Sequence, residues 1–214
     1  MSEPYSAMAR LHLGPAALRR YLDAPSAPWG AWAELTGRYD RSGEIGGLPW
    51  ALHPGPDVTT VERWLTDGDD HRGQLRAFLR TAEGPGLAAV DYDPAAQTLT
   101  LVNLTVHREE FRNPLWFLSV VGGAAGHVDG RGGFAVVRDH LLPGPEHRCT
   151  LGVLAVDGTG ARALHPVRDA EAYGAAVRAA DAAFEATGEG DEGDEGDDPE
   201  EWTGFDPVAR LEAL

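Results

Sequence analysis

The side chains with which this chain could do chemistry are eight histidines, a single cysteine and 34 acidic residues. No two histidines stand at the H-x-x-x-H or H-E-x-x-H spacing that places two metal ligands on one face of a helix. The lone cysteine excludes an internal disulfide and a zinc site built from several cysteines. The sequence also contains no G-x-S-x-G nucleophile elbow and no P-loop. We therefore expect neither a bound metal nor a cofactor.

His147 and Cys149 come closest to a catalytic pair. They lie two residues apart at the edge of a predicted strand, so both side chains share one face, where an imidazole could lower the pKa of the thiol. No known motif surrounds them, and a lone cysteine is usually a small buried hydrophobic side chain. We expect that second role for Cys149.

An enzyme of an unrecognised type is the alternative function, with its site around Asp139, His140 and His107. Asp139 and His140 follow one predicted strand and His107 follows another, so the fold would have to assemble the site. Residues in such positions are more commonly caps or surface groups. The loop of residues 38–56 is a second place where such a site could be built.

Residues 38–56 have the composition of a binding loop. They are rich in glycine, proline and charge and show neither a helical nor a strand period, which in a segment of this length is typical of a functional loop. Aromatic and basic side chains of the kind that dominate protein interfaces occur in it, and those expected to bind a partner are Arg38, Tyr39, Trp50 and His53. The alternative is that Trp50 fixes the loop on its own domain.

Hydrophobic periodicity divides the chain into helices followed by strands. Strands are predicted over 8–13, 87–92, 98–106, 134–138, 150–156 and 161–166, and helices after Gly14, from Ser26, over 75–82, after Asn113 and from Asp169. This order predicts a single α+β domain over residues 1–186, with a mainly antiparallel sheet of about five to six strands and helices packed on it. We expect the helices after Asn113 and Asp169 to cover the same face of the sheet.

The strand predicted over 98–106 changes its apolar face after Leu101. Leu99 and Leu101 share one side, whereas Val102, Leu104 and Val106 share the other. Either both faces of this strand are covered, or a β-bulge turns it over.

The net charge of −16 is concentrated near the C-terminus. Residues 185–201 carry ten acidic side chains and no basic one, in a low-complexity Gly-Asp-Glu pattern that cannot pack. We expect residues 187–201 to be a disordered acidic linker, and the domain to end near Ala186. Such charge disfavours nucleic acid and anionic membranes as partners. No apolar run is long enough to span a bilayer and no signal peptide is recognisable, which predicts a cytoplasmic location.

The segment of residues 202–214 regains the signals of an ordered structure. Asp206 is a good N-cap and Pro207 suits the first helical position, while Phe205, Val208 and Leu211 recur every three residues. So short a helix forms only against another surface. Either Phe205, Val208 and Leu211 bind a partner, or the segment folds back onto its own domain.

The function that the sequence favours is a non-enzymatic, intracellular protein–protein interaction. The partner is expected to be a protein with a basic surface, and the chain to be its inhibitor or an immunity-type neutraliser. Immunity proteins of bacterial toxin systems include small acidic α+β proteins, although no motif here ties the chain to any of their families. A third interpretation is a subunit of a homo-oligomer.

Overall fold

The computed structural model describes residues 5–26, 70–82, 86–106, 112–139, 149–188 and 206–214, and its centre is a six-stranded sheet. The strands are β1 (Tyr5–His12), β2 (Ala88–Asp93), β3 (Thr98–Val106), β4 (Gly133–Asp139), β5 (Cys149–Asp157) and β6 (Gly160–Ala163). The helices are α1 (Pro15–Leu22), α4 (His71–Leu79), α5 (Arg112–Gly122), α6 (Ala170–Gly188) and α7 (Pro207–Glu212). The strand order is β2-β3-β1-β4-β5-β6, and every pairing is antiparallel. The predicted α+β class with a mainly antiparallel sheet is confirmed.

The first strand of the chain lies inside the sheet, between β3 and β4. Its alternate residues Ala7, Ala9 and Leu11 face one side of the sheet, and Met8 faces the other; all four are fully buried. Successive side chains of a strand point to opposite faces, so a strand that is apolar at both sets of positions needs cover on both.

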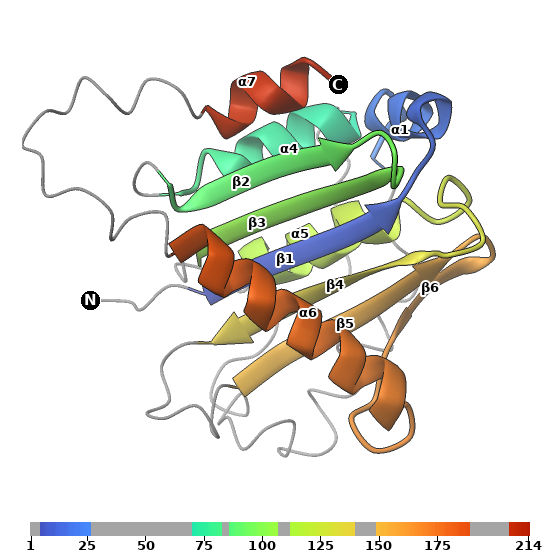
Figure 1. Cartoon of the computed structure of the whole chain (residues 1–214), viewed down its shortest axis with the longest axis vertical. Helices are drawn as coiled ribbons and strands as arrows, with labels where there is room; N and C mark the ends of the chain where they lie inside the picture. The colour runs from blue at the N-terminus through green and yellow to red at the C-terminus, as the bar shows by residue number, and fades with distance from the viewer. Residues whose placement is uncertain (1–4, 27–69, 83–85, 107–111, 140–148, 189–205) are drawn as a thin grey trace, which may run out of the picture.

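Helices cover the two faces of the sheet unequally. On one face α5 packs with α1, α4 and α7 over a core to which β1 contributes Leu11 and β3 contributes Leu101. On the other face α6 is the helix that packs among the described elements, and it buries Ala180 and Phe184 against Met8. Figure 1 shows α6 crossing the strands in front of the sheet and α5 behind it.

The expectation that the helices after Asn113 and Asp169 share one face of the sheet was therefore wrong. Four adjacent strands each present a buried apolar side chain to α6, namely Val102, Met8, Val136 and Val153. One face of helices would leave these residues in water, at a cost of about 1.5–3 kcal/mol for each side chain.

The change of apolar face along β3 results from cover on both sides. Leu99 and Leu101 enter the core under α5, and Val102 enters the core under α6. A register shift is present as well, where β3 pairs with the start of β1, between Tyr5 and Ala7. The shift lies beyond Val102, so it does not cause the change of face.

The C-terminal helix folds back onto its own domain. Asp206 caps α7 by accepting a hydrogen bond from the Val208 amide at 2.8 Å, and a proline follows it, as predicted. Leu211 is 0% exposed, and Val208 and Leu214 pack against the same core. Figure 1 shows α7 beside α4 at the β2 edge of the sheet.

The described helices also bear on the predicted boundaries. The last long helix, α6, ends at Gly188, and α7 then adds an apolar side chain to the core. Most of the acidic linker predicted over 187–201 lies outside the described residues. None of the helices in the described ranges combines the length and the apolar character that crossing a membrane requires.

Candidate functional site

Most residues that the sequence singled out lie outside the described part of the chain. This holds for Arg38, Tyr39, Trp50, His53 and Phe205, and also for His107 and His140. The backbone of Asp139 is described, at the end of β4, where it pairs with Tyr5 and Cys149. Of the residues predicted to bind a partner, Val208 and Leu211 are described, and they pack within the chain; their role in binding remains a prediction.

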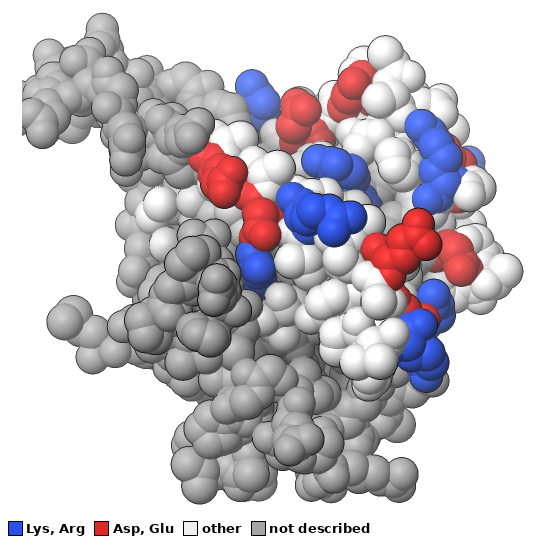
Figure 2. Space-filling view, turned by 60° about the horizontal axis from the view of Figure 1, so that its bottom comes forward, with Lys and Arg blue, Asp and Glu red and all other residues white. Residues whose placement is uncertain are grey.

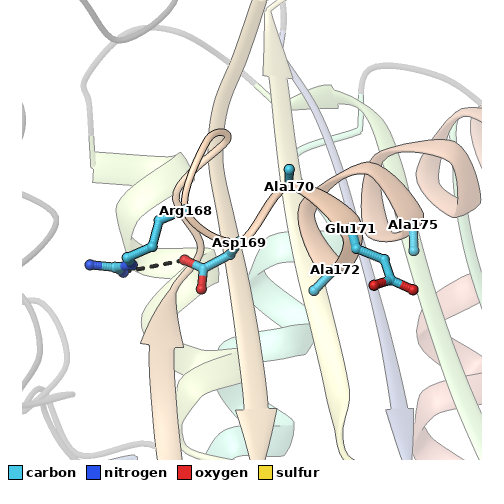
Figure 3. Close-up of a pocket in the computed structure, with 6 residues that line it drawn as sticks. All are labelled: Arg168, Asp169, Ala170, Glu171, Ala172 and Ala175. Carbon is cyan, nitrogen blue, oxygen red and sulfur yellow. Dashed lines mark hydrogen bonds and ion pairs between the residues drawn. The ribbon is translucent and has the colours of Figure 1, made fainter.

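The described residues hold no pre-formed metal centre, since no group of three or more His, Cys, Asp or Glu side chains converges among them. A shallow, open hollow of about 440 Å³ lies at the start of α6. Figure 3 shows the Arg168 side chain turned toward the Asp169 carboxylate, 3.2 Å away.

Asp169 in this hollow already has its partners. Its carboxylate accepts hydrogen bonds from the amide of His165 at 2.8 Å and from Arg162 at 3.1 Å. These bonds, the one from His165 foremost, lower its pKa to about 2. The arrangement secures the first turn of α6 and supplies no free catalytic group.

A more promising surface is the part of the sheet that α6 leaves open. One row of neighbouring residues crosses all six strands there, and we call it the open row; it consists of Asp91, Thr100, Arg10, Phe134, Ala155 and Arg162. The row beside it is the buried apolar row that packs against α6. In the open row the two end residues are exposed and the four central ones are half-buried. It is thus the edge at which the core under α6 reaches solvent.

Arg10, on the central strand β1, is the charged residue of this row that is half-buried. Within the described residues its guanidinium makes no ion pair and no hydrogen bond. A titratable neighbour on the same face is His12, two residues along the strand. Burial, and next the charge of Arg131, lower the pKa of His12; Asp129 raises it, and Arg10 lowers it further. Arg10 is therefore a cation beside a basic neighbour, and its hydrogen-bond donors have no acceptor among the described residues.

Phe134 lies directly across from Arg10 in the β1–β4 pairing. The ring is half-buried and packs against the core under α6. On its other side Arg10 pairs with Thr100 of β3. A planar guanidinium with five donors can hold a carboxylate with two parallel hydrogen bonds, while the ring and the threonine give contact area around it.

Charge is mixed on the face of the molecule that Figure 2 draws. Figure 2 shows basic and acidic side chains interspersed over the described residues of the face that it draws. This face therefore does not present a broad electrostatic potential of one sign, and a partner that binds it must be recognised by individual side chains.

Comparisons with models of known protein families, with curated proteins and with solved structures found no match.

Sequence reasoning did not select Arg10 or Phe134. The alternation of Arg10 and His12 with Leu11 and Leu13 was visible, and it assigned Arg10 to the polar face of a strand. The sequence does not reveal the pairing of β1 with β4, because about 120 residues separate the two strands, and α1, α4, β2, β3 and α5 lie between them in the chain. That pairing places Arg10 directly across from Phe134 on neighbouring strands.

Proposed function

We propose that this protein is a non-enzymatic protein–protein interaction protein that binds its partner through the open row of the sheet. The observation that carries the proposal is the half-buried residue Arg10, which lies between Thr100 and Phe134 in the sheet and whose guanidinium has no ion pair or hydrogen bond within the described residues. Arginine and aromatic side chains are enriched among the residues that contribute most to protein interfaces.

The energetics of Arg10 favour a carboxylate from a partner. A half-buried cation has lost part of its hydration, and no described residue offers an anion in exchange. A partner that places an Asp or Glu side chain against Arg10 would supply that anion while it covers Phe134. Charge-assisted, two-point hydrogen bonds of this kind are among the strongest that proteins make.

The remaining surface of the partner is proposed to be basic. The net charge of −16 and the ten acidic residues over 185–201 would attract a basic protein over a distance and speed its encounter. The partner we propose is thus a basic protein with a carboxylate at the centre of its contact surface. Inhibition or immunity-type neutralisation of such a protein, in the cytoplasm, is the narrower form of this proposal.

The test uses the full-length chain to capture a partner from its native host, followed by binding measurements with the purified pair. Arg10→Ala should raise the dissociation constant at least tenfold, which corresponds to a loss of about 1.4 kcal/mol in binding free energy. Arg10→Lys should also weaken binding, because an ammonium cannot form the two-point contact. Added salt should mainly slow association.

Arg20→Ala is the matched control, since Arg20 is an exposed arginine on α1, also unpaired within the described residues. It should change the dissociation constant less than Arg10→Ala does. Equal binding by Arg10→Ala and the unchanged protein would exclude the open row as the contact surface. Self-association in place of a foreign partner would favour a homo-oligomer, and the lack of any specific partner would contradict the interaction function itself.

A further inference from the structure

His71 joins the C-terminal end of α1 to the N-terminal end of α4. Its backbone amide donates to the carbonyl oxygen of Ala24 at 3.0 Å, and its ring nitrogen Nδ1 lies 2.9 Å from the carbonyl oxygen of Tyr21. A carbonyl oxygen only accepts hydrogen bonds, so Nδ1 carries the proton. The other ring nitrogen, Nε2, then carries no proton and has a lone pair that can accept a hydrogen bond.

That second nitrogen is buried without a partner. The His71 residue is 3% exposed, and no donor or acceptor within the described residues bonds to Nε2. It presses against the backbone of Gly123, just after α5, so closely that a methyl group at Gly123 would lie 2.2 Å from it. A proton placed on Nε2 would meet no acceptor among the described residues.

The groups around the imidazole come from three elements. From α1, the ring of Tyr21 stacks on it with centroids 4.6 Å apart, and the Tyr21 hydroxyl is engaged with the carbonyl oxygen of Val120. From the start of α4, the Asp70 carboxylate favours a positive charge, but it is occupied in capping the helix through the Gly73 amide. From the turn after α5, His127 disfavours that charge.

Burial has the largest effect on the titration of His71. It lowers the pKa below the ordinary value of 6.5, and the hydrogen bond to the Tyr21 carbonyl and the Asp70 charge oppose it only in part. The pKa of His127 is lowered too, by burial and then by the charge of Arg20. Two histidines whose rings both lie near Tyr21 thus both resist protonation in the folded chain.

We propose that His71 is a proton-sensitive contact, and that its protonation in mildly acidic solution separates the end of α1 from the start of α4. A protonated imidazole must leave the site or draw in water, because Nε2–H has no acceptor there. Departure of the ring removes the bond to Tyr21 and exposes the pairing of Ala24 and Pro25 with His71 and Asp70. Beyond these, the Asp23–Arg72 ion pair at 3.3 Å joins the two helices, and as an exposed pair it holds them weakly.

The direction of the effect follows from proton linkage. In the unfolded or opened state His71 regains a pKa near 6.5, whereas in the closed state the pKa lies lower. The open state therefore binds more protons in the window below about 6.5, and closure weakens as the pH falls through that window. One proton changes the opening equilibrium by up to about tenfold per pH unit.

Hydrogen–deuterium exchange of the full chain between about pH 8 and pH 5, corrected for intrinsic exchange rates, tests the proposal. Peptides covering residues 15–26 should lose protection several-fold to tenfold relative to peptides of β1 and β4 as the pH falls below about 6.5. In His71→Asn, whose short amide can still donate to the Tyr21 carbonyl but cannot titrate, this relative loss should disappear. His127→Asn should keep this relative loss in smaller measure, because removal of a charge that disfavours protonation of His71 raises the pKa of His71 in the closed state.

The same relative loss in His71→Asn would overturn the proposal. Should that variant fail to fold, nitrogen NMR of the imidazole in the unchanged protein provides a second readout. A His71 titration that coincides with loss of protection at Tyr21–Ala24 supports the proposal. A His71 that titrates while those amides stay protected contradicts it, as does one that remains neutral while they open.

Discussion

The carbonyl oxygen of Leu211 accepts a hydrogen bond from Nη1 of Arg72 at 2.8 Å, although 139 positions separate the two residues. The bond ties α7 to α4 beside the buried Leu211 side chain. A second contact between the same helices is the ion pair of Arg76 with Glu212. The last nine residues of the chain are thus attached to the domain by a buried side chain, a backbone acceptor and a charge pair.

Leu211→Ala should destabilise the domain by about 2–5 kcal/mol, the cost of deleting a buried leucine and leaving a cavity. Urea denaturation of the full chain measures this. Ala209→Ser, on the exposed side of α7, is the matched control and should cost about 0.5 kcal/mol or less. An unchanged denaturation midpoint for Leu211→Ala would show that α7 leaves the domain in solution. The apolar face of α7 would then be available to bind a partner.

The buried ion pair between Arg138 of β4 and Asp181 of α6 gives a second prediction. Arg138 is 6% exposed, so Asp181→Asn would remove a negative charge from beside a buried guanidinium. We expect a loss of about 2–4 kcal/mol, at or below the usual range for breaking a buried pair because Asp181 is partly exposed. The control is Glu212→Gln, which breaks the more exposed pair with Arg76 and should cost about 1 kcal/mol or less. Similar losses for the two variants would contradict the view that burial makes the difference.

The dependence of global stability on pH should show two separate declines. Burial lowers the pKa of His12, His71 and His127, so the unfolded chain binds more protons than the folded one below about pH 6.5. Stability should be fully present above that pH and fall as the pH decreases through the lower folded pKa values. A second decline should follow in more acidic solution, where hydrogen bonds hold the pKa of Asp169 at about 2.

Urea midpoints measured between about pH 8 and pH 2 test both declines. Each histidine contributes at most about 1.4 kcal/mol per pH unit. His71→Asn should flatten the first decline, and Asp169→Asn should flatten the second without changing the first. A stability that rises on acidification from pH 7 to pH 5 would contradict the assigned directions for the histidines.

Local patterns predicted much of this fold because they depend on neighbours in the chain. The alternation around Leu11 and the cap at Asp206 each describe a local choice of backbone, and both are found in the structure. The side of the sheet that a helix covers is not local. Placing α6 required knowing that Met8, Val102 and Val136 stand in one row, which depends on the pairing of strands far apart in sequence.

The same limit applies to the candidate sites. His71 follows an acidic cap and shows no motif, so its importance arises from the glycine that its ring contacts across the core. The periodicity around Arg10 predicted a polar strand face, but the neighbouring Phe134 came from pairing. Residues that meet only through tertiary contacts have no fixed spacing in the sequence, so a sequence pattern cannot predict that they interact.

The contact between Gly123 and His71 gives the last prediction. A methyl group at position 123 would lie 2.2 Å from Nε2 of His71, so Gly123→Ala must displace the buried ring and should cost about 1–3 kcal/mol. Gly130→Ala is the matched control, because Gly130 has a backbone without positive φ and no atom within 4 Å of the added methyl; it should be nearly neutral. The stability of the double variant Gly123→Ala/His71→Ala then separates a clash from a general loss of packing. If the ring is the obstacle, the double variant should be more stable than the sum of the two single changes predicts, by about 0.5–3 kcal/mol. Additive losses would show that Gly123→Ala acts on something other than His71.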